Sequence, residues 1–509
     1  MKTLHVVLSV LVWLGMLAAE AFVAVRLLAL NVLPIKYGLL ICLGMLLVWL
    51  LVGLLLLSGN RAQDGKHPGL GRRIFAGLLA VMTIGGCMYG THVVTQLDQT
   101  IEKITDEVDV KSVVAVYVRQ NDPAQTLEDA ADYTFGVSES YDAENVHIAL
   151  VDLREQLGSV KTRNYETVVD MVNALKKGDI GAIVLNEAYP AVLEDIAEYE
   201  HLSDEIRVIY EVTIDIDPSA RSQSEEQGIG DDDSIENFQP VDVTKEPFII
   251  YISGSDTRSW FLTNSRSDVN ILAVVNPQSH QILLLNTPRD YYVVNPASIY
   301  KEMDKLTHCG LYGVDCSAIA LSDLYKVPVN YYAQINFVGF ETFIDAIGGI
   351  TVHSDLAFTS GGVSFVEGDN YLNGYEALYF ARERHSFNYG DLQRGQNQME
   401  VISAVIRKLS MGTIIMNYSQ IMDSLQGMFI TNMSSDDISD LVRMQLSSRP
   451  EWNIKTFTVS GSDGYAYTYS MPGVSPYVMF QDPELVDRAS GLVNKVLNSD
   501  TLTDADVAK

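Results

Sequence analysis

The strongest structural signal in the sequence is the segment Val269-Asn-Ile-Leu-Ala-Val-Val-Asn-Pro-Gln-Ser-His-Gln-Ile-Leu-Leu-Leu285. It holds two apolar runs, residues 269–275 and 282–285, joined by turn-forming residues, which predicts a β-hairpin. Residues 248–252, just upstream, predict a further strand. Because these runs are apolar on both faces, we expect helices to cover the strands on both sides. The sequence therefore predicts an α/β domain with a central mixed β-sheet flanked by helices.

Arginine and aspartate residues gather at the ends of these predicted strands. Asp256 and Arg258 follow the first strand. Arg266 and Asp268 precede the second strand, and Arg289 follows the third. Guanidinium groups can bind phosphate oxygens through two parallel hydrogen bonds, and paired carboxylates suit a hard divalent cation such as Mg²⁺ that shares phosphate oxygens. The pattern predicts a magnesium-assisted phosphoryl-transfer site.

A second charged cluster lies farther along the chain. Arg382 and Arg384 are two residues apart, so an extended backbone would turn both guanidinium groups to one face. Gly390-Asp391 predicts a helix start with Asp391 as the N-cap, and Arg394 and Gln398 would then stand one turn apart on one face. A single arginine more often forms a surface salt bridge, but several beside clustered acids favour phosphate binding. The stripe of this helix that is predicted to pack in the core comprises Leu392, Met399, Ile402, Ile406 and Leu409.

The N-terminal region contains three apolar segments, residues 4–30, 37–57 and 74–94. Each is long enough to cross a bilayer as a helix. A cleaved signal peptide is the alternative for the first segment, but that segment is too long and two more follow it. Between the second and third segments, Arg61, Lys66, Arg72 and Arg73 face one acid, and short basic loops stay in the cytoplasm. We therefore expect a cytoplasmic N-terminus and an extracytoplasmic chain from about residue 95 onward.

Charge and composition divide the rest of the chain. Beyond residue 94 the sequence holds 28 basic and 63 acidic residues, a balance that excludes a nucleic-acid-binding role. Alternating strand-like and helix-like runs predict a small α/β accessory domain over residues 95–216. Residues 217–246 are acidic and poor in apolar side chains, which predicts a flexible linker. The sheet domain is expected to begin at residue 247.

The four cysteines fall in two compartments. Cys42 and Cys87 lie inside apolar spans, where they pack as small hydrophobic side chains. Cys309 and Cys316 lie in the part of the chain expected to be extracytoplasmic, where a disulfide can persist. Spacing alone leaves a bridge and two free thiols equally open, and two cysteines with one histidine make an incomplete set of zinc ligands.

Eight sequence blocks, in order, resemble the signature of the LytR-CpsA-Psr family, densely over residues 246 to 410. Thr431-Asn-Met-Ser434 resembles the C-terminal region of that family, which implies a domain over residues 247–498, followed by a disordered tail over residues 499–509. The three apolar spans and the intervening accessory domain further resemble the capsule-type branch of that family. The blocks are Ile252-Ser-Gly-Ser-Asp-Thr-Arg258, Arg266-Ser-Asp268, Asn286-Thr-Pro-Arg-Asp290, Asp304-Lys-Leu-Thr-His308, Asn336-Phe-Val-Gly-Phe340 with Asp345-Ala-Ile-Gly-Gly349, Leu372-Asn-Gly-Tyr-Glu-Ala-Leu378, Arg382-Glu-Arg384 and Gly390-Asp-Leu-Gln-Arg394.

The resemblance implies a membrane enzyme of a Gram-positive-type envelope. It would transfer an anionic glycopolymer, such as a teichoic acid or a capsule polymer, from a polyprenyl-pyrophosphate carrier in the membrane lipid to peptidoglycan. Carried over by position, Asp256 and Asp268 match the acids that hold Mg²⁺ (or Mn²⁺), while Lys305 and Asp391 match positions lining the same site. Whether Asp391 is the general base or only a helix cap stays open. The residues matching the pyrophosphate-binding positions are Arg266, Arg289, Arg382, Arg384, Arg394 and Gln398.

Two other functions remain compatible with the sequence. The same site could act on water as a plain polyprenyl-pyrophosphate pyrophosphatase. Alternatively, the protein could be a non-catalytic polyprenyl-phosphate-binding regulator of envelope or capsule synthesis. A glycopolymer transferase would form covalent polymer on the wall, a pyrophosphatase would release free polymer phosphate, and a regulator would do neither.

Overall fold

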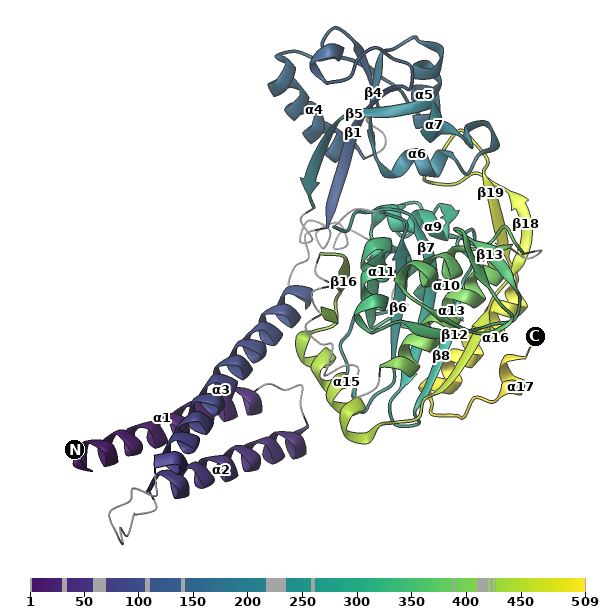
Figure 1. The fold of residues 1–509 in the computed structure, drawn as a ribbon. Helices are drawn as coiled ribbons and strands as arrows, with labels where there is room; N and C mark the ends of the chain where they lie inside the picture. Colours follow the sequence, from purple (N-terminus) through teal and green to yellow (C-terminus); the bar gives the residue numbers. More distant parts are fainter. Residues whose placement is uncertain are drawn as a thin grey trace. The chain divides into compact units, whose positions relative to one another are not determined.

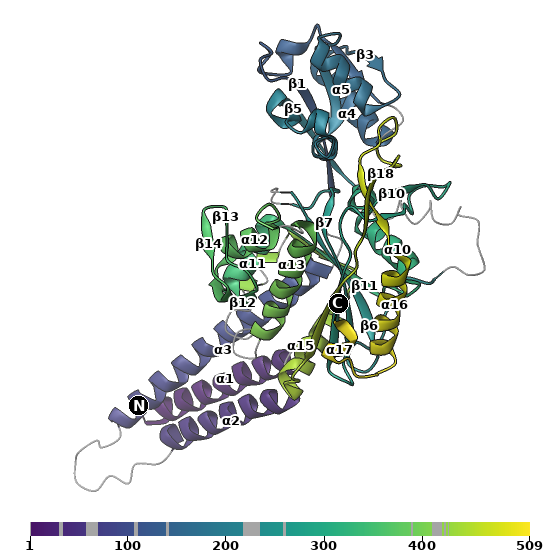
Figure 2. The ribbon, with the colours of Figure 1, turned by 90° about the vertical axis from the view of Figure 1, so that its right-hand side faces the viewer.

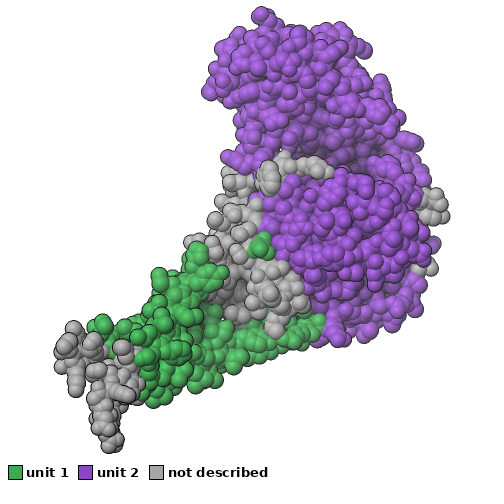
Figure 3. Space-filling view, in the orientation of Figure 1, with its two compact units in different colours: residues 1–103, 410–423, 434–450 green, residues 104–409, 424–433, 451–509 purple. Residues whose placement is uncertain are grey.

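The computed structural model describes residues 2–29, 34–57, 70–105, 110–138, 142–216, 235–257, 261–387, 390–409, 420–421, 424–425 and 427–508. The chain divides into two compact units, coloured separately in Figure 3. Unit 1 comprises residues 1–103, 410–423 and 434–450, and unit 2 comprises residues 104–409, 424–433 and 451–509.

Unit 1 is helical. Its helices are α1 (Lys2–Ala29), α2 (Ile35–Leu57), α3 (Leu70–Thr105) and α15 (Ser435–Ser448). Among the described residues, three segments are apolar and long enough to cross a membrane, which confirms the three predicted spans: Val7–Leu28, Ile35–Leu56 and Ile74–His92. Residues 58–69, which include Arg61 and Lys66 of the basic segment on which the predicted orientation depends, lie outside the described residues.

Two tryptophans hold α1 against α2. The rings of Trp13 and Trp49 stack with centroids 4.3 Å apart. Each indole N–H also donates to the backbone carbonyl of the other residue, at 3.0 Å from Trp13 and 3.2 Å from Trp49. A Cβ added at Gly53 would collide with the Trp13 ring, so the glycine makes room for this stack. The first two spans therefore form a specific helix pair.

The accessory domain, residues 110–216 of unit 2, is a small α/β domain (Figure 1). Hydrophobic clusters lie on both faces of its sheet. Within the described residues its sheet has the order β3-β2-β4-β1-β5. Residues 188–199 form two short helical segments separated by a turn at residues 194–196. The strands are β1 (Lys111–Arg119), β2 (Thr134–Val137), β3 (Lys161–Asn164), β4 (Ala182–Asn186) and β5 (Ile206–Asp215). The helices are α4 (Ala143–Leu157), α5 (Val168–Lys177), α6 (Ala188–Leu193) and α7 (Leu202–Glu205), with 3-10 turns at Glu128–Ala130 and Ala197–Tyr199.

The sheet domain is built on a mixed sheet whose order, over the described residues, is β16-β11-β6-β7-β8-β17. β6, β7 and β8 are antiparallel neighbours, while β11 runs parallel to β6 and β17 runs parallel to β8. The predicted hairpin and the predicted mixed sheet are thus confirmed. The strands are β6 (Phe248–Ser255), β7 (Ser267–Asn276), β8 (Gln281–Asn286), β11 (Tyr331–Asn336), β16 (Phe429–Thr431) and β17 (Asn453–Thr458).

Helices cover both faces of this sheet, as its uniformly apolar strands predict. α10 and α16 lie on one face, and α11, α12 and α13 lie on the other (Figure 2). The helices of the domain are α9 (Leu306–Cys309), α10 (Val314–Tyr325), α11 (Phe337–Ala346), α12 (Gly374–Arg382), α13 (Gly390–Lys408), α16 (Pro483–Leu497) and α17 (Asp504–Val507). Short strand pairs complete it: β9 (Tyr292–Val294) with β10 (Met303–Lys305), β12 (Ile350–Ser354) with β15 (Gly368–Leu372), β13 (Phe358–Ser360) with β14 (Val363–Phe365), and β18 (Gly461–Tyr465) with β19 (Tyr477–Gln481).

Two predicted boundaries need correction, whereas the third span, Ile74–His92, agrees with its predicted bounds although α3 continues to Thr105. Residues 217–234 of the predicted linker lie outside the described residues, but residues 235–246 pack on the sheet domain: the Phe238 amide donates to the Val329 carbonyl at 2.8 Å, and Val243 is buried. The predicted disordered tail is wrong for residues 499–508. There Leu502 is buried, and its amide donates to Gln281 Oε1 at 2.7 Å. The next residue, Thr503, is the N-cap of α17.

Cys309 and Cys316 are both buried and present as free thiols. The Cys309 thiol lies against the Lys305 carbonyl at 3.8 Å, and the Cys316 thiol lies 3.5 Å from Asn295 Oδ1. The neighbouring Cys316 and the burial raise the pKa of Cys309, so this thiol is held in its protonated, unreactive form.

Candidate functional site

The predicted charged residues meet at one edge of the central sheet. Asp256 follows the end of β6, while Arg266 and Asp268 flank the start of β7. Because β7 runs antiparallel to β6 and β8, the start of β7 lies beside the ends of its neighbours, and Arg289 follows the end of β8. Lys305 reaches the same place from the end of β10. Arg258 lies outside the described residues.

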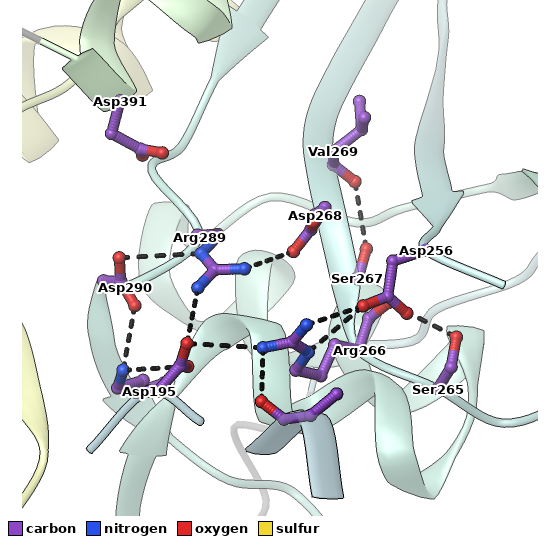
Figure 4. Close-up of polar contacts among 12 residues, drawn as sticks. Asp195, Asp256, Ser265, Arg266, Ser267, Asp268, Val269, Arg289, Asp290 and Asp391 are labelled. Carbon is purple, nitrogen blue, oxygen red and sulfur yellow. Dashed lines mark hydrogen bonds and ion pairs between the residues drawn. The ribbon is translucent and has the colours of Figure 1, made fainter. Parts of the chain in front are cut away.

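Arg266 joins the sheet domain to the accessory domain. Its Nη2 and Nε donate to Asp256 Oδ2 at 2.7 and 3.2 Å. Its Nη1 donates to the Ala191 carbonyl at 2.8 Å and to Asp195 Oδ1 at 3.3 Å. Figure 4 shows the guanidinium lying between these groups, with Asp256 on one side and Asp195 on the other. The side chain is only 13% exposed, so this fork has a fixed orientation.

Arg289 stands at the centre of the cluster and is 6% exposed. Its Nη1 donates to Asp268 Oδ1 at 2.6 Å and its Nη2 to Asp195 Oδ1 at 2.9 Å. Its Nε lies 3.7 Å from Asp290 Oδ2. Each of the three guanidinium nitrogens thus faces a different carboxylate (Figure 4). Burial acts against the charge, but Asp268, Asp290 and Asp195 outweigh it and hold the pKa of Arg289 well above its usual value.

Lys305 is almost fully buried, at 1% exposure. Its Nζ lies 3.0 Å from Asp290 Oδ1 and 3.2 Å from Asp195 Oδ2. The preceding residue, Asp304, is fully buried and accepts hydrogen bonds from Asn295 Nδ2 at 3.0 Å and the Ser470 amide at 3.0 Å, which fixes the β10 end. A buried ammonium held by two carboxylates is a strong phosphate-binding group once one of them is exchanged for a phosphate.

Arg384 and Arg394 belong to the same electrostatic cluster. Burial, followed by the nearby charges of Arg289 and Arg394, lowers the pKa of Arg384. Arg394 is 6% exposed and pairs with Asp391. Like-charged guanidinium groups gathered in this way repel one another, and a polyanion bound between them would offset this repulsion.

The most buried face of helix α13 is shifted from the predicted one. Arg394, Gly395 and Gln398 are buried, whereas Met399 is the one buried member of the predicted core stripe and the other four are half-buried. The reason is local: a Cβ added at Gly395 would collide with the side chain of Asn286, so the glycine lets this polar face press against the end of β8. Gln398 Nε2 donates to the Ala381 carbonyl at 3.4 Å.

Two further predictions about this region are wrong in detail. Asp391 is the second residue of α13, with its side chain paired to Arg394, and is not the N-cap. Arg382 ends α12, so it does not share an extended backbone with Arg384. Its guanidinium lies over the Phe337 ring, 4.3 Å from the centroid, which is a cation–π contact. A role for Arg382 in phosphate binding stays a prediction.

Asp256 and Asp268 form a pair of carboxylates that interact electrostatically. Burial and the charge of Asp268 raise the pKa of Asp256, against the opposing effect of Arg266. Burial acts in the same direction on Asp268, but Arg289, Arg266 and Arg394 hold its pKa below its usual range. Within the described residues no group of three or more acids, histidines or cysteines could enclose a metal ion. Carboxylates are the donors that a hard cation keeping several waters prefers, so a Mg²⁺ or Mn²⁺ ion held by Asp256 and Asp268 stays a prediction.

Small polar side chains support the strand ends from behind. Ser255 and Ser265 share a hydrogen bond of 2.7 Å, and Ser253 and Ser267 share another of 2.7 Å, across the β6–β7 pair. Tyr251 OH donates to Asn270 Oδ1 at 2.7 Å and lies 3.0 Å from Ser267 Oγ. These buried bonds fix the loops that carry Asp256, Arg266 and Asp268.

Sequence reasoning missed two carboxylates of the cluster, Asp195 and Asp290. Asp290 adjoins Arg289 in a quoted motif, so adjacency alone could have suggested it. Asp195 stands in the accessory domain, for which no catalytic pattern is visible. One signal was present: Glu194 and Asp195 follow the C-terminus of α6, where the helix dipole disfavours acids, so a cationic partner elsewhere was needed.

Comparisons with known proteins agree on one family. The LytR_cpsA_psr family profile matches residues 212–481. A polyisoprenyl-teichoic acid--peptidoglycan teichoic acid transferase TagU of Bacillus mycoides is 31% identical over 230 residues, 44% of this chain and 74% of the relative. The TagU of Enterococcus faecalis is 33% identical over 199 residues, 39% of this chain and 65% of the relative. The crystal structure of B. subtilis TagV is similar at 24% identity and a TM-score of 0.41, covering 51% of this chain and 99% of that one.

The profile covers the three loops at the sheet edge, helix α13 and the strands that position them. The residues that meet at this edge are the ones through which the sequence resembles the same family. The chain belongs to the LytR-CpsA-Psr family.

Proposed function

We propose that this chain is a membrane-anchored transferase that moves an anionic glycopolymer from a polyprenyl-pyrophosphate carrier to peptidoglycan. One observation carries the proposal: Arg266, Arg289 and Lys305 converge on a single point beside the carboxylate pair, with Arg384 and Arg394 close by. Such a constellation suits a diphosphate, whose charge is spread over several oxygens. The TagU relatives, named as teichoic acid transferases, support this donor class and acceptor.

The proposed reaction is a phosphoryl transfer that conserves the polymer. An acceptor hydroxyl of peptidoglycan forms a new P–O bond to the phosphorus that carries the polymer. The bond between this phosphorus and the bridging oxygen of the diphosphate breaks, and the carrier leaves as the polyprenyl monophosphate. The proton of the hydroxyl goes to a general base. Because little covalent chemistry falls to the protein, positioning and electrostatic stabilisation supply most of the rate.

The residues divide these tasks. Arg266, Arg289 and Lys305 would bind the donor phosphates in a site where little water competes. Asp256 and Asp268 would hold Mg²⁺ or Mn²⁺, which would neutralise charge on the phosphoryl oxygens.

Asp391 is the proposed base. Burial, together with the charge of Asp290, raises its pKa, and a base with a raised pKa accepts a proton more readily near neutral pH. Arg394, its partner in the structure, opposes this shift, so loss of that contact would strengthen the base further.

We also propose that the site faces the outside of the cell. Peptidoglycan lies outside the membrane, and the basic segment at residues 61–73 favours a cytoplasmic loop between the second and third spans. Protease digestion of intact spheroplasts tests this orientation: the accessory and sheet domains should be cleaved, and their protection would contradict it.

The function is tested with the purified full chain, Mg²⁺, a polyprenyl-pyrophosphate-linked teichoic acid and peptidoglycan. We expect covalent polymer in the wall fraction and equimolar polyprenyl monophosphate. Arg289→Ala should abolish both products. Arg407→Ala is the matched control, because Arg407 is an exposed residue of α13 paired with Glu400, and a surface pair contributes little. Free polymer phosphate without wall-bound polymer would indicate a pyrophosphatase, and the absence of both products would leave only a binding role.

A further inference from the structure

A carboxylate of the accessory domain lies inside the cation cluster. Asp195 Oδ1 lies 2.9 Å from Arg289 Nη2 and 3.3 Å from Arg266 Nη1, and its Oδ2 lies 3.2 Å from Lys305 Nζ. Figure 4 shows the Asp195 side chain as the point where these three cationic groups converge. The side chain is 13% exposed, so water does not separate the charges. Asp195 therefore contacts three cationic nitrogen donors, as a phosphate group in this place would.

The same donors cannot serve Asp195 and a substrate at once. The other two nitrogens of Arg289 already face Asp268 and Asp290, so Nη2 is the one directed away from the sheet domain's own acids. Arg266 uses Nη2 and Nε on Asp256, which leaves its Nη1 for the accessory domain. A phosphate that gathers these two nitrogens and Lys305 Nζ must occupy the place of the Asp195 carboxylate.

Protonation cannot release this contact. Burial alone would raise the pKa of Asp195, but Arg289, Lys305 and Arg266 outweigh it and hold the pKa well below its usual range. The side chain thus stays charged at any physiological pH. Its removal requires either a competing anion or a movement of the turn at residues 194–196.

The accessory domain does not depend on Asp195 for its attachment. The Lys111 amide donates to the Leu262 carbonyl at 3.0 Å, and Met471 and Leu311 of the sheet domain pack in the hydrophobic cluster of the accessory domain. The Asp195 turn follows a helix of six residues and contributes a side chain to the cluster without belonging to the sheet edge. It can therefore leave while the phosphate-binding loops keep their fold.

We propose that Asp195 is an autoinhibitory carboxylate: it occupies the place of a donor phosphate between Arg266, Arg289 and Lys305, and the diphosphate must displace it to bind. This inference rests on the proposed function, because it takes the cation cluster as the diphosphate site. The accessory domain thereby lowers the affinity of the resting enzyme for phosphates, since a ligand gains only the difference between its own contacts and those of Asp195.

The first experiment measures the binding of inorganic pyrophosphate to the detergent-purified full chain by calorimetry, at fixed Mg²⁺ and salt. We expect Asp195→Asn to lower the dissociation constant by about tenfold or more, because the competing charge is gone. Glu194→Gln is the matched control: it removes the same charge one residue away, where Glu194 Oε1 accepts from the Ser203 amide at 2.8 Å. It should stay within about twofold of the wild type. Asp195→Glu keeps the carboxylate, so this variant should bind pyrophosphate as weakly as the wild type does.

A second experiment needs no variant. Hydrogen exchange of the wild-type chain should rise over α6 and the turn at residues 194–196 when pyrophosphate saturates the site, because these residues lose their anchor. Unchanged or slower exchange there would overturn the proposal. So would an Asp195→Asn variant that binds pyrophosphate as weakly as Glu194→Gln, or more weakly than the wild type, which would assign Asp195 to the positioning of the cations.

The two proposals fail in different ways. If wild type and Asp195→Asn bind pyrophosphate equally and Arg289→Ala does not bind it, the autoinhibitory contact is refuted while the phosphate site stands. If pyrophosphate binding behaves as expected but no polymer reaches the wall, the transferase function is refuted while the carboxylate still competes with phosphates.

Discussion

The side chain of Asn286 fills the space in which a Cβ of Gly395 would stand. Asn286 ends β8 and Gly395 lies in the second turn of α13, so this contact fixes the helix against the end of the strand. Arg394 precedes the glycine and Gln398 lies one turn beyond it, both on the buried face. The distance of the helix from the sheet thus sets the position of its phosphate-binding side chains.

Gly395→Ala should therefore impair transfer more than it impairs folding. The added methyl group would collide with the buried Asn286 side chain, so we expect α13 to move away from β8 and displace Arg394. Misplacement of a positioning group by about 1 Å can reduce a rate by about a hundredfold. The measurement is the rate of wall-polymer formation together with the melting temperature. Gly491→Ala in α16 is the control, because a Cβ there meets nothing within 4 Å, and alanine favours a helix. Full activity of Gly395→Ala would show that the contact does not position the site.

Arg384 and Arg382 should differ in importance. Arg384 is half-buried and feels the charges of Arg289 and Arg394, whereas Arg382 is exposed over the Phe337 ring. We expect Arg384→Ala to reduce the transfer rate by about a hundredfold, as loss of a transition-state contact does, and Arg382→Ala to reduce it by about tenfold or less. Steady-state rates with lipid-linked polymer check this order. The reverse order would mean that Arg382 swings into the site when substrate binds.

Asp256→Asn should raise the magnesium requirement. The substitution removes one of the two carboxylates of the pair, so we expect the half-saturating Mg²⁺ concentration for transfer to rise about tenfold or more. A magnesium titration of the initial rate measures this change. Asp152→Asn, a variant in α4 whose carboxylate accepts from Tyr210 OH, should titrate like the wild type. An unchanged requirement in Asp256→Asn would remove Asp256 from the metal site.

Glu187 should make stability depend on pH. Burial, followed by the charge of Glu211, raises its pKa from 4.5 to about 7. The folded state disfavours the ionised form of Glu187. The contribution of Glu187 to the free energy of unfolding is therefore fully present below about pH 4.5 and is lost as the pH rises through about 7. Glu187→Gln removes this loss, which is at most about 3 kcal/mol. The variant and the wild type should melt together at pH 4.5, and the variant should melt higher at pH 8. Exposed Glu155→Gln should show no such divergence.

The parts of the fold that the sequence predicts are those with strong local patterns. The apolar runs of β6, β7 and β8 need no tertiary information to be recognised as buried strands, and the hairpin predicts that β7 and β8 are neighbours. The sheet-edge residues Asp256, Arg266, Asp268 and Arg289 could be placed together because antiparallel neighbours bring alternate strand ends to one edge.

The remaining features depend on long-range packing. The buried face of α13 is polar, because Gly395 and Arg394 meet Asn286 and the charged cluster, and periodicity of apolar residues favours the opposite choice. Asp195 reaches the site from a different domain, 71 residues before Arg266, and no spacing within a motif links them. The C-terminal residues look disordered by composition, yet buried Leu502 anchors them.

The packing of these last residues makes the C-terminus part of the sheet domain. Leu502 binds Gln281 at the start of β8, Asn453 Nδ2 donates to the Leu502 carbonyl at 3.1 Å, and Lys455 pairs with Asp504 across the outer strand. Strand β17 lies at one edge of the sheet. An edge strand with unpaired backbone groups can pair with other chains. Residues 502–504 contact this strand, so deletion of residues 500–508 would expose the edge and favour aggregation.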